Sequence, residues 1–294
     1  MAETENSKQI FRLGHWLQNA ILRGLIGALL LLPYRWRVPL CGKVFAYVIA
    51  PLAGYTRRIR NNLALVMPDM PQAEVARMCR AVPDNVGRTI IEMYSGEEFR
   101  ARVAASPIRG EGLAALEQAR AEGRPVVLVT GHFGNYDASR VALAARGFRI
   151  GGLYRPMSNR YFNAHYVAAM AYFGEPLFPR GRQGMSAMIR FLRSGGMLGI
   201  VQDQHMKLGV PMKFFGRDAM TALSASELAL KYNALLIPAY ATRLPDRLNF
   251  DIWVDAPLPH SNAEAMTQAL NDHLEAHVRQ HMDQWFWIHK RWKI

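Results

Sequence analysis

The pattern of hydrophobic and polar positions changes near residue 124. Residues 56–104 and 111–122 look helical, whereas the chain beyond them alternates short apolar runs with segments of helical spacing. The expected strands cover 125–130, 148–154, 197–202, 234–242 and 248–254, and the expected helices cover 135–146, 159–173, 183–194, 222–233 and 262–283. This alternation predicts an α/β domain with a mainly parallel central sheet flanked by helices.

The N-terminal region carries a long apolar run. Residues 20–32 read AILRGLIGALLLL, aromatic and basic residues follow at 34–37, and a second apolar run covers 44–52. The first run is marginally long enough for a bilayer, and the cluster after it is typical of a headgroup interface. We expect residues 1–55 to be a helical membrane-anchoring segment, as a single span or a re-entrant anchor. An interfacial helix pair and a soluble core helix remain open alternatives.

The candidate catalytic residues follow the first strand of the expected sheet. His132 lies on a turn that Gly131 and Gly134 permit, and Asp137 follows five positions later. On one regular helix the two side chains would point about 140° apart, so they meet only if His132 is on the turn and Asp137 on the next helix. A histidine needs a carboxylate to fix its tautomer and stabilise its charged form. We therefore predict that His132 is a general base oriented by Asp137.

Further polar residues lie at or after equivalent strand ends. Arg155 follows the second strand and Asp203 the third, and the carboxyl ends of parallel strands form the usual site of such folds. Arg155 suits an oxyanion or a phosphate, and Asp203 suits a second carboxylate or an acceptor for a sugar hydroxyl. Arg180 and Arg182 occupy a glycine-containing loop that runs into a helix, where an anion could bind. Each of these side chains also has a plain structural interpretation as a solvated strand-end or loop residue.

Composition restricts the partners. The chain has 294 residues, with 36 basic and 23 acidic side chains and a net charge of +13, which favours nucleic acid, a membrane surface or an acidic protein as a partner. Three tryptophans and three basic residues alternate within 285–293, where they could stack on bases, lie at a membrane interface or line a substrate site. The two cysteines have no metal-ligand spacing, and no metal site is predicted. Thr221 is interpreted as a helix N-cap.

Several motifs in this order resemble one family. They are Arg60-Asn61-Asn62-Leu63 before Met67-Pro68-Asp69, the H-x4-D of His132 and Asp137, Tyr154-Arg155-Pro156, the Asp203 segment and Trp287-Ile288-His289-Lys290-Arg291-Trp292. With the hydrophobic N-terminus, they make the chain similar to the lipid A biosynthesis acyltransferases, the late lauroyl and myristoyl transferases. The similarity covers nearly the whole chain.

The resemblance implies an enzyme at the cytoplasmic face of the bacterial inner membrane, with residues 56–294 as its acyltransferase domain. It would transfer a fatty acyl chain from acyl carrier protein to a hydroxyl of a lipid A precursor, with no cofactor. The catalytic pair of the family falls on His132 and Asp137. Candidate oxyanion donors are the backbone N–H groups near Gly134 and the Arg155 guanidinium, and Arg180 and Arg182 would meet acceptor phosphates.

Three alternatives remain at this point. The same chemistry on another glycolipid or phospholipid, with acyl-CoA as a possible donor, is the nearest one. A nucleic-acid-binding protein is disfavoured by the apolar run at 20–32, and no nucleic-acid partner is expected. A non-catalytic membrane scaffold would not depend on His132.

Overall fold

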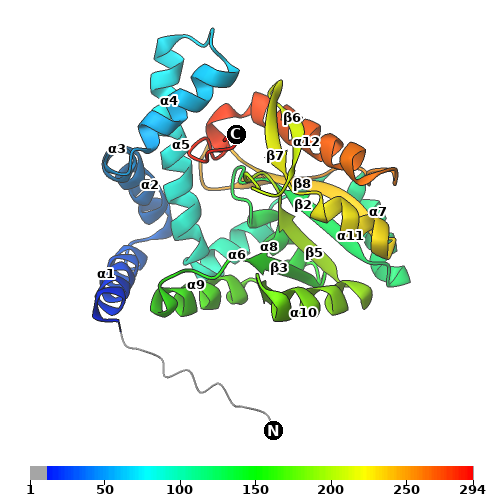
Figure 1. The fold of residues 1–294 in the computed structure, drawn as a ribbon. Helices are drawn as coiled ribbons and strands as arrows, with labels where there is room; N and C mark the ends of the chain where they lie inside the picture. Colours follow the sequence, from blue (N-terminus) through cyan, green and yellow to red (C-terminus); the bar gives the residue numbers. More distant parts are fainter. Residues whose placement is uncertain (1–11, 294) are drawn as a thin grey trace.

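The computed structural model describes residues 12–293, so the first eleven residues of the expected anchoring segment lie outside the described part. Its centre is a seven-stranded sheet with the order β1-β9-β8-β2-β5-β3-β4 (Figure 1). The strands are β1 (Ile108–Arg109), β2 (Val126–Thr130), β3 (Ile150–Tyr154), β4 (Leu177–Pro179), β5 (Met197–Val201), β8 (Leu235–Arg243) and β9 (Phe250–Val254).

The sheet is mainly parallel, as predicted. The strands β8, β2, β5, β3 and β4 run in one direction, and only the pairing of β8 with β9 is antiparallel. The exception arises because residues 244–249 join β8 directly to β9 without a crossover helix. The five parallel strands therefore present their carboxyl ends at one edge.

Helices cover both faces of the sheet because β2 is apolar on both sides. Val126 and Leu128 pack with α7 (Gly112–Glu122) and α8 (Ala138–Ala145), whereas Val127 and Val129 pack in a core that also contains α10, α11 and α12. Continuous burial of a strand on both faces is typical of parallel sheets with a helix layer on each side. The other helices of this half are α9 (Arg160–Tyr172), α10 (Arg182–Arg193), α11 (Ser224–Tyr232) and α12 (Ala263–Gln280).

An antiparallel hairpin was not predicted. Its strands are β6 (Val210–Phe214) and β7 (Arg217–Thr221), which form a separate two-stranded sheet. The interpretation of Thr221 as an N-cap is wrong, because Thr221 ends β7, is fully buried and donates its hydroxyl to the Ala219 carbonyl. The hairpin joins the Asp203 segment to α11.

A helical layer precedes the sheet. It comprises α1 (Leu13–Leu30), α2 (Tyr34–Val44), η1 (Phe45–Ile49), α3 (Ala50–Leu52), α4 (Tyr55–Val66), α5 (Gln72–Met93) and α6 (Gly96–Ala104). The apolar run 20–32 does not continue as one long helix, because α1 ends at Leu30 and Pro33 precedes α2. Within residues 12–293 no single helix meets the length and hydropathy of a membrane span; one pair does so jointly, Tyr34–Leu52 with Tyr55–Val66, bent by 84°.

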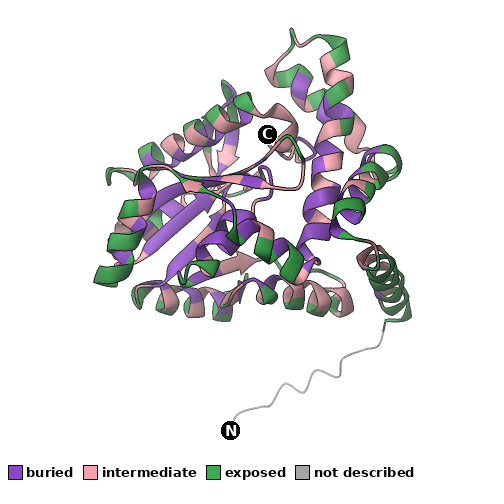
Figure 2. Cartoon of the chain, turned by 180° about the vertical axis from the view of Figure 1, so that it is seen from behind, coloured by how far each residue is buried: buried purple, intermediate pink, exposed green. Residues whose placement is uncertain are grey.

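The first helix is largely exposed (Figure 2), and several of its exposed side chains are hydrophobic. Leu13, Leu17, Ile21 and Leu25 recur every four residues and are 65%, 51%, 55% and 59% exposed. Positions four apart lie on one side of a helix. The side chain of Asn159 attaches this helix to α9 through hydrogen bonds to the His15 carbonyl and to Gln18.

The C-terminal tryptophans are part of a core. Trp285, Trp287 and Trp292 are 1%, 0% and 8% exposed and pack with Phe214 of the hairpin. The expectations that they stack on bases or lie at a membrane interface are therefore wrong. Asn62 holds this segment by donating hydrogen bonds to the carbonyls of Trp287 and His289, which gives the Asn61-Asn62 motif a structural role.

Candidate active site

The centre of the site is the turn between β2 and α8. Gly131 and His132 follow the last residue of β2, and Asp203 lies two residues beyond β5, the parallel neighbour of β2. Gly131 has no room for a side chain, because a Cβ there would lie 2.7 Å from a Leu274 methyl carbon and 3.2 Å from Asp203 Oδ2. This close approach brings the His132 backbone onto the Asp203 carboxylate.

His132 and Asp203 form a hydrogen-bonded pair. His132 Nδ1 lies 2.7 Å from Asp203 Oδ1, and the backbone N–H of His132 donates to Asp203 Oδ2 at 2.7 Å. The indole N–H of Trp285 also donates to Oδ2, at 2.8 Å. An ionised carboxylate can only accept, so Nδ1 carries the hydrogen and the free lone pair of the neutral imidazole is on Nε2.

The carboxylate of Asp203 is buried but stays ionised. Burial by itself would raise its pKa, but the neighbouring His132 and the hydrogen bonds from His132 and Trp285 outweigh burial and lower the pKa from 3.8 to about 2. The Asp203 side chain is 3% exposed, whereas that of His132 is 22% exposed. The Nδ1 side of the imidazole therefore contacts a buried carboxylate, and the opposite side of the ring is partly exposed to solvent.

The prediction that Asp137 orients His132 is wrong in its geometry. Asp137 is the residue before α8, and both of its carboxylate oxygens accept hydrogen bonds from Arg140, at 2.6 and 2.8 Å. Arg140 in turn donates to the carbonyls of Met170 and Gly174, which ties α8 to the end of α9. His132 lies on the turn as predicted, but α8 begins at Ala138 instead of at 135, and an arginine one helical turn beyond Asp137 takes its carboxylate.

Among the backbone N–H groups near Gly134 that were predicted as oxyanion donors, that of Gly134 itself is already bonded within the protein. Its N–H donates to the Gln284 carbonyl at 2.9 Å, and its carbonyl accepts from Asn85 and Thr89 of α5. Gly134 has a φ of +56°, and a Cβ there would lie 1.8 Å from the Ala241 carbonyl oxygen. Glycine is required here because the turn is packed against β8, not because a substrate approaches it.

Aromatic rings enclose the imidazole. The Tyr136 ring meets that of His132 edge to face at 5.1 Å, and the Phe286 ring lies at 5.7 Å. The Phe286 N–H donates to the His132 carbonyl at 3.0 Å. On the exposed side, Gln204 Nε2 lies 3.4 Å from His132 Nε2. Sequence reasoning did not identify Gln204 or Trp285, because nothing in the sequence shows that either side chain reaches the pair.

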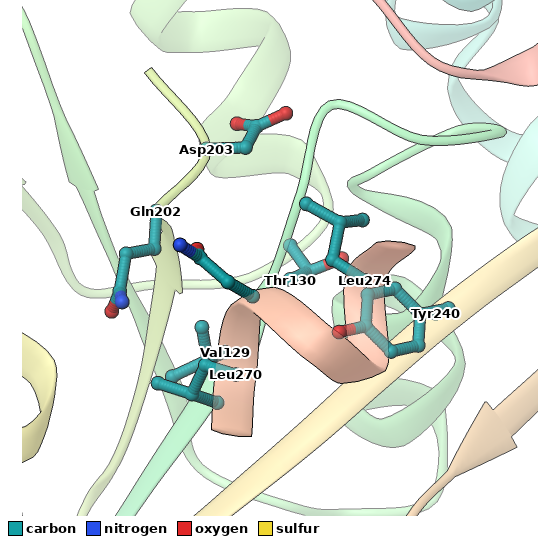
Figure 3. Close-up of a pocket in the computed structure, with 8 residues that line it drawn as sticks. Val129, Thr130, Gln202, Asp203, Tyr240, Leu270 and Leu274 are labelled. Atoms are coloured by element: carbon teal, nitrogen blue, oxygen red, sulfur yellow. The ribbon is translucent and has the colours of Figure 1, made fainter. Parts of the chain in front are cut away.

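A cavity of about 10 Å³ lies beside Asp203 (Figure 3). It is lined by Val129, Thr130, Gln202, Asp203, Tyr240, Leu270, Asn271 and Leu274. Both polar atoms of the Gln202 side-chain amide face the interior without a partner among the described residues. The volume is that of about one water, so this cavity does not accommodate a fatty chain.

The predicted arginines lie along the same edge of the sheet. Arg155 follows β3, the neighbour of β5, and Arg180 and Arg182 follow β4, the neighbour of β3. All three are exposed, and the Arg180 N–H donates to the Tyr154 carbonyl at 2.8 Å. The sheet order thus places the three cations on one side of the His132–Asp203 pair. Within residues 12–293, no group of three His, Cys, Asp or Glu side chains is arranged to hold a metal ion.

This arrangement can be compared with known proteins. The model of the bacterial lipid A biosynthesis acyltransferase family matches residues 3–294. The chain belongs to this family. It is therefore an acyltransferase of the lipid A biosynthesis type.

Curated relatives agree with this assignment. A lipid A biosynthesis acyltransferase of Haemophilus influenzae is 24% identical over 94% of this chain and 86% of its own. The lipid A biosynthesis lauroyltransferase of Escherichia coli K12 is 24% identical over 80% of this chain and 78% of its own. A phosphatidylinositol mannoside acyltransferase of Mycobacterium tuberculosis is 23% identical over 81% of this chain and 78% of its own. The names of all three relatives describe acyl transfer to a glycolipid.

Proposed function

We propose that this enzyme transfers a fatty acyl chain from acyl carrier protein to a hydroxyl of a lipid A precursor. The family and two of the relatives support the acceptor. The observation that carries the chemistry is the 2.7 Å contact between His132 Nδ1 and Asp203 Oδ1, with Nε2 directed to the exposed side. A thioester donor is already activated, so the reaction requires no cofactor; acyl-CoA is the alternative donor.

The mechanism follows from the tautomer. The acceptor hydroxyl gives its proton to His132 Nε2 as its oxygen attacks the thioester carbonyl carbon. Asp203 stabilises the resulting imidazolium and holds the ring in place. The tetrahedral adduct then collapses, the C–S bond breaks, and the imidazolium returns the proton to the departing sulfur. Asp203 thereby takes the role that the sequence had assigned to Asp137.

Anionic substrate groups would bind beside this pair. Arg155, Arg180 and Arg182 line the adjacent carboxyl end of the sheet and are exposed. Arginine suits phosphate because its planar fork of donors binds two oxygens at once. The acceptor phosphates, or the phosphate of a phosphopantetheine arm, fit such a surface. The net charge of +13 favours an acidic carrier protein and an anionic membrane as partners.

The exposed stripe of α1 is the proposed membrane contact. Leu13, Leu17, Ile21 and Leu25 face solvent together, and Trp16 and Trp36 are 45% and 58% exposed near them in sequence. Tryptophan favours membrane–water interfaces, and an amphipathic helix binds there through its apolar side. We place the enzyme on the cytoplasmic face of the bacterial inner membrane, where a carrier-protein donor is available.

The test is an assay of the purified full chain with acyl carrier protein thioesters of graded length and a lipid A precursor. His132→Ala should lower turnover several hundred-fold or more, because general-base assistance contributes about 10²–10⁴-fold. The matched control is His260→Ala, on the loop before α12, which should retain turnover. Normal turnover of folded His132→Ala would remove His132 from this role.

A mannoside acceptor is the second candidate, because one relative carries that name. The same assay should include a phosphatidylinositol mannoside as a competing acceptor. We expect higher kcat/KM with the lipid A precursor. In cells, mass spectrometry of lipid A from a deletion strain should show the loss of one acyl chain, and an unchanged acyl number would count against this acceptor.

A further inference from the structure

The proposed reaction requires a donor for the oxyanion that forms on the thioester carbonyl. The Gly134 N–H is not available, since it is bound to Gln284. The Arg155 guanidinium lies beyond β3, separated from the end of β2 by β5. A different group lies next to the reacting nitrogen: Gln204 Nε2 is 3.4 Å from His132 Nε2.

The chemistry of the imidazole fixes the direction of the Gln204 contact. Because Nδ1–H is directed to Asp203, His132 Nε2 is an acceptor, and only the NH₂ group of the amide can donate to it. The NH₂ group lies beside the reacting nitrogen before substrate binds. An incoming hydroxyl would take its place at Nε2, and rotation of the Gln204 side chain would then turn the NH₂ group to the carbonyl oxygen of the adduct.

The backbone beneath Gln204 is held rigidly. Its carbonyl accepts from the Arg291 guanidinium at 3.4 Å, and the next N–H, of His205, donates to His289 Nε2 at 2.9 Å. One residue further, the Met206 N–H donates to the Met220 carbonyl at 3.0 Å. A fixed backbone with an exposed amide at its tip resembles a preorganised donor more than a mobile surface side chain.

Arg291 explains why this loop keeps its position. It is fully buried, and it donates to the Met220 carbonyl at 2.9 Å and to the Thr221 hydroxyl at 2.7 Å as well as to Gln204. One side chain of the C-terminal segment therefore joins the Gln204 loop to the end of β7.

We propose that the Gln204 side-chain amide is the oxyanion donor of this enzyme. This rests on the proposed acyl transfer. As the hydroxyl oxygen attacks and its proton passes to His132, the carbonyl oxygen becomes negative and accepts a hydrogen bond from Gln204 Nε2. When the C–S bond breaks, that oxygen becomes the ester carbonyl and the hydrogen bond weakens. Gln204 gives and takes no proton.

The test compares three substitutions in the full-length enzyme with saturating thioester and acceptor. Gln204→Leu should lower kcat about 10²–10³-fold and leave both KM values within about threefold, because loss of one preorganised donor acts on the transition state alone. Gln204→Asn should lie between Leu and wild type. Gln118→Leu, an exposed glutamine on α7, is the matched control and should keep the wild-type kcat.

The isosteric Gln204→Glu separates the donor role from a packing role. It keeps the shape but removes the NH₂ group and puts a carboxylate beside His132 Nε2. We expect kcat to fall at least as far as in Gln204→Leu, and the acidic limb of the kcat/KM profile to move to higher pH, since a nearby anion stabilises the imidazolium. The shift of the profile follows from the carboxylate in either case, so the kcat decides: a side chain that only packs would give Glu the wild-type kcat at a pH where His132 is neutral.

Two results would overturn this proposal without affecting the function. One is a Gln204→Leu kcat within threefold of wild type while His132→Ala is inactive. The other is a loss in Gln204→Leu that lies entirely in KM. If His132→Ala itself turns over normally, the proposed mechanism fails before the question of the oxyanion arises.

Discussion

Two carboxylates flank the same turn, and their surroundings differ. Asp203 accepts from His132 and Trp285, and within residues 12–293 no arginine or lysine side chain is hydrogen-bonded to it. Both carboxylate oxygens of Asp137 accept hydrogen bonds from Arg140. A carboxylate whose oxygens are bound by a guanidinium is already neutralised and is not available to an imidazole. A carboxylate bound by an indole N–H and a backbone N–H, which are neutral donors, can still stabilise a positive charge on the histidine. Of these two acids, the one that pairs with His132 is the one that no arginine binds, although it is the more distant along the chain.

The largest effect is expected from Asp203→Asn. The amide would favour the wrong imidazole tautomer, and in a well-studied histidine–aspartate pair of another enzyme class that change costs about 10⁴-fold in kcat. We expect a loss of that order here, measured as kcat with saturating donor and acceptor. Asp255→Asn is the control, because Asp255 also pairs with a histidine, His273, at 3.0 Å but outside the site. Equal losses in both variants would mean that the effect is structural.

Asp137→Asn should affect stability more than chemistry. Removing one partner of a buried ion pair leaves Arg140 uncompensated, which costs about 3–5 kcal/mol in the free energy of unfolding. Denaturant unfolding measures this, and kcat per folded molecule should stay within about tenfold of wild type. A double-mutant cycle of Asp137→Asn, Arg140→Met and the double variant measures the interaction free energy between Asp137 and Arg140. A kcat loss in Asp137→Asn as large as in Asp203→Asn, with unchanged stability, would restore Asp137 as the orienting acid.

The smallest expected effect is a decrease in the free energy of unfolding at acid pH. The folded pKa of Asp203 is lowered to about 2 from 3.8, so its contribution is fully present above the unfolded value and is lost as the pH falls through the folded value. The shift corresponds to about 2 kcal/mol. The difference in unfolding free energy between wild type and Asp203→Asn should therefore shrink between pH 6 and pH 3. A difference that stays constant with pH would mean that Asp203 is not held as an anion by its neighbours.

The strands of the central sheet were predicted from the sequence more accurately than the helices of the N-terminal layer. The five principal strands were located within two residues at each end, because a buried strand between turn residues is a local signal. The hairpin of β6 and β7 was missed because its strands are only five residues long, contain Pro211 and the adjacent charges of Arg217 and Asp218, and lack a continuous apolar run. The apolar run 20–32, part of the membrane-anchoring segment expected at 1–55, is divided because α1 ends at Leu30 and Pro33 follows.

The strand–helix alternation, the turn that holds His132, and the positions of Arg155 and Asp203 at strand ends could be predicted from local patterns, because each depends on neighbours a few residues away. The pairing of β5 with β2, which brings a carboxylate 71 positions from His132 to its Nδ1, arises from the folded sheet. The binding of Asp137 by Arg140 and the burial of the C-terminal tryptophans likewise arise from the tertiary structure. The order of strands in a sheet and the competition between partners for one acid arise from packing across the whole chain, which local patterns do not contain.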